Sequence, residues 1–242
     1  LKGHLHGSIM STAGSSTTLT VASGEAADST ASDLMVLASS TAKTTSAWTV
    51  GSTNGGLDTG SIAANTWYYW FLIKRPDTGV VDVLFSLSAT APTMPTNYTL
   101  FRRIGAALSN GSSQWLKFLQ IGDEFQWAVP LNNINNQNPG TGGASYTLSV
   151  PPGITVRANT QFGFTNSTAG IFCYIESNLT DVTASSVIGA FTLSNQVANQ
   201  YGTARMEIWT PNGQVHAQCS TASNNGLYAA TFGWIDQRGR LA

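Results

Sequence analysis

The chain has 242 residues and a formal net charge of −1, and only 10% of its residues are charged, where an ordinary soluble domain has about 25%. No run of basic residues is longer than a pair, as at Arg102 and Arg103, so the positive surface that nucleic-acid binding requires is missing and we expect no nucleic-acid partner. The longest apolar run, residues 67–73, is far shorter than the roughly 20 residues of a membrane-spanning helix, so we expect no membrane insertion.

Short apolar or alternating runs, separated by Gly, Asn, Asp and Pro, follow one another along the chain. None shows the 3.6-residue period of an amphipathic helix, so the pattern predicts an all-β protein. In chain order, the predicted strands cover residues 17–21, 34–38, 66–74, 80–87, 99–108, 115–121, 124–129, 146–150, 154–164, 171–176, 186–193, 203–209, 214–219 and 227–235.

The most aromatic part of the chain, residues 66–88, predicts a core hairpin. Its turn contains Pro76, which presets φ, and Gly79, which tolerates positive φ. Apolar side chains occupy both faces of the first arm, which indicates a strand covered on both sides. Asp77 lies in the turn and Asp82 on a strand face, so they do not form the facing carboxylate pair that glycoside hydrolysis requires.

Other signatures of catalysis are also missing from the sequence. Asp123 and Glu124 are the only adjacent acids, and neighbouring strand residues point to opposite faces. No nucleophile-elbow, phosphate-loop, zinc-protease or dinucleotide motif occurs. We therefore predict a protein that is not an enzyme and has no cofactor.

His4 and His6 form the one pattern that resembles a metal site. In a strand, residues two apart point to one face, and three chains around a threefold axis would bring six imidazoles together. The favoured interpretation is an exposed first strand without metal, because two histidines of a single chain would bind a metal only weakly.

Residues 130–145, PLNNINNQNPGTGGAS, contain almost no apolar side chains and are rich in Asn, Gly and Pro. This composition is typical of a linker or long surface loop. We therefore predict two β-barrel or β-sandwich domains of jelly-roll-like type, residues 1–129 and 146–242, joined by this linker.

Cys173 and Cys219 lie in separate predicted strands of the second domain, with no further Cys or His at a spacing typical of metal ligands. The favoured interpretation is two buried free thiols. The alternative is a disulfide.

Four aromatic residues of the second domain are candidate contacts for a glycan, because aromatic rings stack on sugar faces. Each lies at the strand parity opposite more aliphatic neighbours. The alternative, which we favour at this stage, places them in the second face of a two-sided core or in a subunit interface. The four are Tyr174, Trp209, Tyr228 and Trp234.

The order of several motifs carries a resemblance. The chain reads GGLDTGSIAANTWYYWFLIKRPDTGVVDVLFSLSATAPTMPTNYTLFRRIGA at residues 55–106, followed by FLQIGDEFQW. Near the start it reads TLTVASGEAADST, and at the expected linker NPGTGGASYTLSVPPGI. Together these motifs resemble a segment that recurs in virion proteins of tailed bacteriophages and prophages, usually described as tail-fibre, appendage or other structural proteins. The resemblance spans roughly residues 1 to 157.

The resemblance implies a structural component of a phage virion, assembled in the bacterial cytoplasm with other virion proteins. Fibres of this kind are similar to symmetric homo-oligomers, commonly trimers, so we expect a trimer. The leading hypothesis is a tail fibre or appendage whose first domain attaches to the particle or to its copies and whose second domain touches a host-surface glycan. The alternative is a head fibre, decoration or adaptor protein that acts only in assembly. A carbohydrate depolymerase is disfavoured, because no long solenoid repeat is present.

Overall fold

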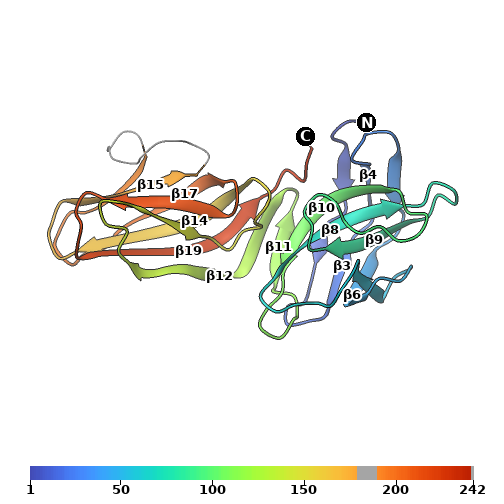
Figure 1. Ribbon diagram of the computed structural model, residues 1–242, viewed down its shortest axis with the longest axis horizontal. Helices are drawn as coiled ribbons and strands as arrows, with labels where there is room; N and C mark the ends of the chain where they lie inside the picture. Colours follow the sequence, from blue (N-terminus) through green and yellow to red (C-terminus); the bar gives the residue numbers. More distant parts are fainter. Residues whose placement is uncertain (179–189, 241–242) are drawn as a thin grey trace. The chain divides into compact units, whose positions relative to one another are not determined.

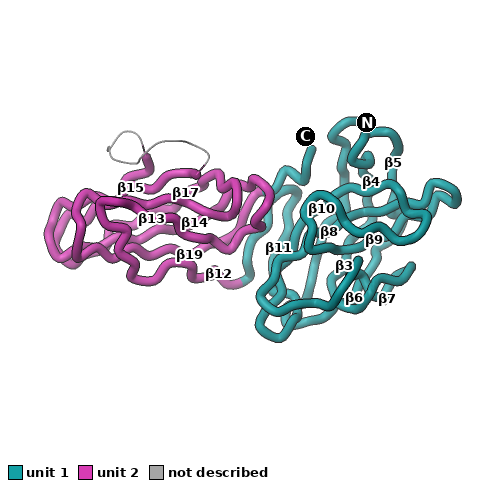
Figure 2. Tube along the Cα trace, in the orientation of Figure 1, with its two compact units in different colours: residues 1–128, 236–242 teal, residues 129–235 magenta. Residues whose placement is uncertain are grey.

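The computed structural model describes residues 1–178 and 190–240. These residues form β-strands and connecting turns, so the prediction of an all-β fold is confirmed (Figure 1). Within these residues, no helix is long and apolar enough to span a membrane. The chain divides into two compact units, residues 1–128 with 236–242 (unit 1) and residues 129–235 (unit 2), as Figure 2 shows.

A seven-stranded sheet is the main element of unit 1. Its strand order is β10-β8-β9-β7-β6-β3-β2, with β7 parallel to β6 and β9 and the other pairs antiparallel. A second sheet has the order β1-β4-β5. The strands of the first are β2 (Met10–Ser11), β3 (Thr18–Val21), β6 (Thr41–Ala47), β7 (Asn54–Leu57), β8 (Trp67–Lys74), β9 (Val81–Ser86) and β10 (Leu100–Leu108), and those of the second are β1 (Leu5–Gly7), β4 (Gly24–Ala27) and β5 (Leu34–Leu37).

The predicted hairpin of residues 66–88 forms the centre of unit 1. Strands β8 and β9 pair antiparallel, with Trp70 opposite Phe85. All residues of β8 between its two ends are buried, which explains why both of its faces are apolar. The Trp70 and Phe85 rings stack with centroids 4.7 Å apart, and Trp115 packs against both. The turn has Gly79 at φ 74°, the left-handed conformation that glycine tolerates best.

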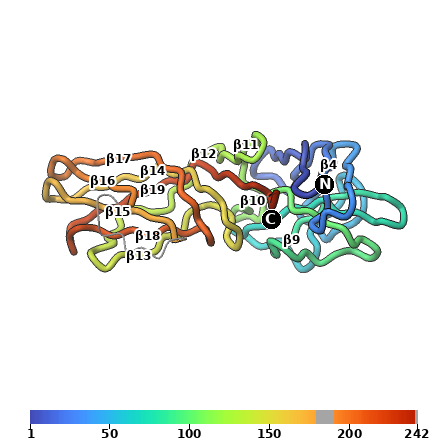
Figure 3. Tube along the Cα trace, turned by 90° about the horizontal axis from the view of Figure 1, so that it is seen from above, coloured from blue at the N-terminus to red at the C-terminus, as the bar shows by residue number. Residues whose placement is uncertain are grey.

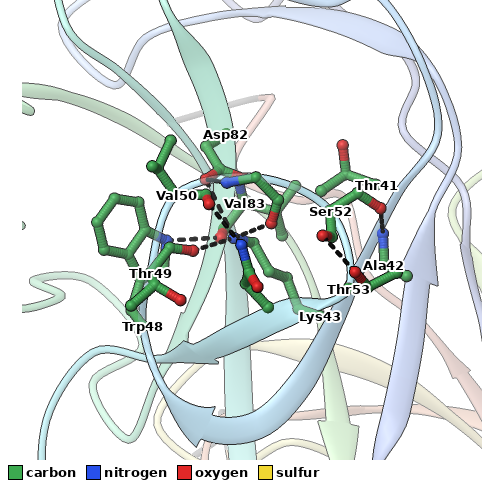
Figure 4. A network of polar contacts seen from close by, with 12 residues as sticks. Thr41, Ala42, Lys43, Trp48, Thr49, Val50, Ser52, Thr53, Asp82 and Val83 are labelled. Atoms are coloured by element: carbon green, nitrogen blue, oxygen red, sulfur yellow. Dashed lines mark hydrogen bonds and ion pairs between the residues drawn. The ribbon is translucent and has the colours of Figure 1, made fainter.

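A buried ion pair joins β6 to this hairpin (Figure 4). Lys43 Nζ donates to Asp82 Oδ2 at 3.0 Å and to the carbonyl oxygens of Thr49 and Gly51 at 2.8 and 2.9 Å. Asp82 also accepts from the backbone N–H groups of Gly51 and Val83. Every ammonium hydrogen of Lys43 has an acceptor, so the buried charge is fully paired.

Two sheets build most of unit 2, and Figure 3 shows them as two layers. One has the order β11-β12-β19-β14-β17, and the other β13-β18-β15-β16. Residues 118–128, which contribute to the first of these sheets, belong to unit 1. Alternate residues of β14 and β17 are buried, the pattern of strands with one face toward a core. The strands are β11 (Phe118–Ile121), β12 (Glu124–Gln137), β13 (Ala144–Thr147), β14 (Val156–Asn166), β15 (Ile171–Ser177), β16 (Phe191–Asn195), β17 (Gly202–Thr210), β18 (Gln214–Cys219) and β19 (Asn225–Ile235).

The structure corrects the linker expected over residues 130–145. Residues 130–137 continue strand β12, and residues 144–147 form β13. Polar side chains do not prevent this pairing, because sheet hydrogen bonds are made by the backbone. Ile134 is buried, and the Asn133 amide makes hydrogen bonds with Ser149 and Thr231. The Asn-rich run is therefore an ordered part of unit 2.

The C-terminal boundary also differs from the expected domain of residues 146–242, because residues 236–242 belong to unit 1. Asp236 forms an ion pair with Arg103, and Asp123 pairs with both Arg238 and Arg240. The paired residues lie far apart in the sequence, so no local sequence pattern indicates that residues 236–242 return to unit 1. The strand predicted over residues 186–193 falls partly outside the described residues, which resume before β16.

Candidate functional site

The outward face of the five-stranded sheet in unit 2 is the best candidate for a binding surface. In β14 and β17, the residues that alternate with the buried ones project outward. Gly163 of β14 lies opposite Thr203 of β17 and also opposite Tyr228 of β19. Residues from three neighbouring strands thus meet in one row across the sheet.

A hollow of about 360 Å³ lies over this row. Gly163 lowers its floor, since a Cβ atom there would meet Thr203, Tyr228 and Tyr201 only at 3.7 to 4.0 Å. Aromatic rings of Tyr201, Tyr228 and Phe232 contribute to the lining. We call this hollow the tyrosine hollow.

The aromatic rings of the tyrosine hollow are held by one another and by a neighbouring cation. The rings of Tyr201 and Tyr228 pack edge to face with centroids 5.4 Å apart. A side-chain hydrogen bond with Tyr201 raises the pKa of the Tyr228 phenol, so this phenol is neutral at pH 7. The Arg205 guanidinium lies 4.5 Å from the Phe232 ring centroid and donates to Asn159. Tyr201 remains 60% exposed, so its ring is accessible to a ligand.

Three polar side chains of the tyrosine hollow are free to bind a ligand. Asn132, Gln161 and Thr203 line it, and their side chains have no hydrogen-bond partner among residues 1–178 and 190–240. Amides and hydroxyls both donate and accept, as the hydroxyl groups of a sugar require. The hollow combines neutral rings with uncharged polar groups and contains no carboxylate.

The structure separates the four aromatic residues that the sequence suggested. Tyr228 lines the tyrosine hollow, and Trp209 projects from the same sheet, 38% exposed, with Arg157 5.8 Å from its ring centroid. Tyr174 is only 7% exposed and Trp234 is fully buried. These two are not available to stack on a sugar.

A β-bulge explains the position of Trp234. The β14–β19 register shifts between Asn159 and Thr160, which lie opposite Gly233 and Thr231, so Phe232 is an extra residue of β19. Beyond the bulge the strand parity is reversed, and Trp234 points away from the face that carries Tyr228. Strict alternation predicts one face for both residues and misses this reversal.

Tyr201 and Phe232 are the aromatic members of the tyrosine hollow that the sequence reasoning missed. Phe232 shares its strand parity with Tyr228, so the same argument could have found it. Tyr201 lies just before β17, outside any alternating pattern, and only the fold brings it to Tyr228.

The histidine pair lies at the first strand of unit 1. His4 Nε2 is 2.9 Å from Glu25 Oε1, and His6 is the register partner of Glu25 across β1 and β4. In the described part of the chain, no group of three or more His, Cys, Asp or Glu residues is arranged to hold a metal ion. Six-imidazole binding would need further copies of the chain.

The acids considered from the sequence each have a structural partner. Arg75 binds both carboxylate oxygens of Asp77. Asp82 belongs to the buried pair with Lys43, and Glu124 accepts from Gln126. The arrangement does not bring Asp77 and Asp82 to one cleft.

A larger hollow of about 650 Å³ lies in unit 1 beside Trp48 and Tyr98. Its charged groups and its indole are already engaged within the protein. Asp58 accepts from the backbone N–H groups of Thr59 and Thr93, and the Trp48 indole donates to a backbone carbonyl. The tyrosine hollow, with its free amides, is therefore the better candidate. Comparisons with protein-family models, with curated proteins and with solved structures each found no match to this chain.

Proposed function

We propose that this protein is a non-enzymatic structural component of a phage virion, a tail fibre or appendage whose unit 2 contacts a glycan on the host surface. The virion assignment is supported by the sequence resemblance over roughly residues 1 to 157 and by the polar, weakly charged composition. The tyrosine hollow is the single observation that carries the glycan contact.

The chemistry of the tyrosine hollow favours a neutral sugar. Pyranose rings present apolar C–H faces that stack on aromatic rings, while amides and hydroxyls fix their orientation. The volume of about 360 Å³ lies at the lower end of the range for small-molecule sites, which suits about one sugar ring of a longer chain. Binding along a polymer with many copies of the protein would add avidity.

The same lining argues for binding and against hydrolysis. Glycosidases require two carboxyl groups flanking the scissile bond, and none lines the tyrosine hollow. Glu207, an exposed acid of β17, is paired with Arg157 at 3.2 Å.

The test is binding of the purified chain to an array of bacterial surface polysaccharides. Tyr228→Ala removes one ring, and Gly163→Val fills the floor while keeping every polar group; both are expected to weaken binding at least tenfold. Phe191→Ala is the matched control, because Phe191 is a 47% exposed aromatic on the other sheet of unit 2. Equal binding by all four proteins would remove the tyrosine hollow from the proposal.

An assembly role is the second candidate, and the edge strand β11 favours it. Leu119 and Ile121 project from one face of this strand and are 55% and 62% exposed. Exposed apolar residues on a sheet edge are typical of a surface that pairs with another chain. Such a surface suits contact with other virion proteins or the trimer that we propose.

Labelling the particle distinguishes the two roles. Antibody fragments against unit 2 would be imaged on intact virions. Label at distal tail fibres supports host contact. Label spread over the head or the tail tube supports a head fibre, decoration or adaptor, and a trimer that dissociates in Leu119→Lys would identify β11 as its interface.

A further inference from the structure

A smaller hollow in unit 1, separate from the tyrosine hollow, is lined by arginines. It has a volume of about 230 Å³. Phe71 and Phe101 provide apolar walls, and Arg102 and Arg238 provide charged groups. Ser29 and Thr90, both exposed, also line it. We call it the Arg102 pocket.

Arg102 is the unusual residue of this pocket. It is only 7% exposed, and its Nε and Nη2 atoms are buried without a hydrogen-bond partner in the part of the chain that the structure describes. Burying a charge without hydrogen-bond partners is unfavourable, because the charge loses its hydration and gains nothing in return. Buried guanidinium groups are therefore normally paired with an acceptor, and this one lines a cavity.

The surrounding charges do not compensate Arg102. Arg103 forms an ion pair with Asp236 and donates to both of its carboxylate oxygens. Asp123 is shared by Arg238 and Arg240. Arg238 Nη1 is a further buried donor without a partner in the described chain.

Asp28 is the remaining acid that acts on Arg102, but its carboxylate is occupied. It accepts from the backbone N–H groups of Thr30, Ser32 and Asp33, and from two hydroxyls. Four guanidinium groups thus face three carboxylates, and none of the three carboxylates forms an ion pair with Arg102. Burial, followed by the charges of Arg103, Arg240 and Arg238, lowers the pKa of Arg102, which shows that its surroundings oppose its positive charge.

We propose that the Arg102 pocket binds an oxyanion, the carboxylate, sulfate or phosphate group of a small ligand. The guanidinium Nε and Nη2 donors form a planar fork that matches two oxygens of such a group. The hydroxyls of Ser29 and Thr90 are placed to bind a third oxygen or the atoms that carry the anion. The volume of about 230 Å³ suits one charged group with little attached to it.

The first experiment measures thermal unfolding of the full chain with increasing sodium phosphate or sulfate, against sodium chloride at equal ionic strength. Specific binding raises the Tm saturably, because only the folded state holds the anion. Arg102→Gln keeps much of the side-chain volume and is expected to lower the affinity at least tenfold. Arg205→Gln is the matched control, since Arg205 is an exposed arginine of unit 2.

Two results would overturn the proposal: no saturable difference between phosphate or sulfate and chloride, or unchanged affinity in Arg102→Gln. If Arg102→Gln does not fold, NMR of the wild-type protein tests the proposal instead. NMR of the arginine Nε–H groups should show a buried signal that shifts saturably with phosphate, and an unshifted set of signals would contradict the site.

A third comparison identifies the source of the anion. Inorganic phosphate, a monosaccharide phosphate and a uronic acid are titrated separately. If the monosaccharide phosphate or the uronic acid binds more tightly than inorganic phosphate, the pocket recognises an acidic saccharide. Equal affinities indicate that it recognises the free ion. This inference is independent of the proposed function, because Gly163→Val should weaken neutral glycan binding at least tenfold and leave anion binding unchanged.

Discussion

Cys173 of β15 and Cys219 of β18 lie directly opposite each other as a non-hydrogen-bonded pair of an antiparallel ladder. The Cys219 N–H group bonds to Gly140 on the other side, while Ser220 donates to Phe172. Residues in such a pair have Cα atoms about 4.5 Å apart, within the range of about 4.4–6.8 Å that a disulfide allows. Both thiols are free and buried in the structure.

The first prediction is that a mild oxidant such as diamide converts the two thiols to a disulfide, with the diamide reduced to its hydrazine. Closing a loop of this length should stabilise the protein by about 4 kcal/mol in the chain-entropy model. A hydrogen bond with Cys219, followed by burial, raises the pKa of the Cys173 thiol, so reaction should be slow in the native state. Intact mass detects the disulfide, and denaturant unfolding measures the change in stability. Cys219→Ala, which cannot form the disulfide, is the control. An oxidised protein that is less stable than the reduced one would contradict the geometry.

The second prediction concerns the buried pair of Lys43 and Asp82. Asp82→Ala leaves the Lys43 ammonium without its carboxylate, and the free energy of unfolding should fall by about 3–5 kcal/mol. The double variant Lys43→Met with Asp82→Leu removes both charges and should be more stable than Asp82→Ala alone. Urea unfolding of the wild type and the two variants measures this, and a double variant that is less stable than Asp82→Ala would contradict the prediction.

The third prediction tests the core hairpin. Phe71 is 1% exposed, so Phe71→Ala should lower the free energy of unfolding by about 3–5 kcal/mol through lost burial and the cavity left behind. Leu87→Ala is the matched control, since Leu87 is 58% exposed and its truncation should change stability by less than about 0.5 kcal/mol. A near-neutral Phe71→Ala in urea unfolding would be incompatible with its position in the core.

The sequence predicts the hairpin of residues 66–88 well because its signals are local. A turn that needs Gly79, flanked by two apolar strands, leaves few other arrangements. Strand pairing through the backbone leaves a weaker signal in the sequence. The polar run that contains Asn133 therefore resembles a linker in its composition, although it forms part of β12. The amino-acid composition of a segment indicates whether its side chains are buried, but it does not indicate whether its backbone N–H and C=O groups pair with a neighbouring strand.

The candidate sites depend on long-range placement and are correspondingly harder to predict. Trp234 follows a bulge whose extra residue, Phe232, has no distinctive sequence signal, so the parity argument fails there. The Arg102 pocket combines β10 with Arg238 from the returning C-terminal segment, and nothing near either arginine indicates the other. Tyr228 was predictable as an outward aromatic residue, but its partner Tyr201 was not.

The last prediction is a pH dependence that arises from Asp28. Its side chain is almost fully buried, which opposes its charge, but hydrogen bonds from Thr30, Asp33 and Ser32 outweigh burial and lower its pKa from 3.8 to about 2. Because the folded-state pKa is depressed, this carboxylate stabilises the protein above about pH 4, and the contribution is lost as pH falls toward 2. A shift of this size corresponds to about 2–3 kcal/mol.

Asp28→Asn removes this titration while keeping the shape of the side chain. At pH 7 the variant should be less stable than the wild type by about 2–3 kcal/mol, and the gap should close between about pH 4 and pH 2 as the wild-type carboxylate takes up its proton. Urea unfolding at a series of pH values measures both curves. A gap that stays constant over this range would mean that the Asp28 loop is held by hydrogen bonds alone and that the charge of its carboxylate contributes nothing to folding.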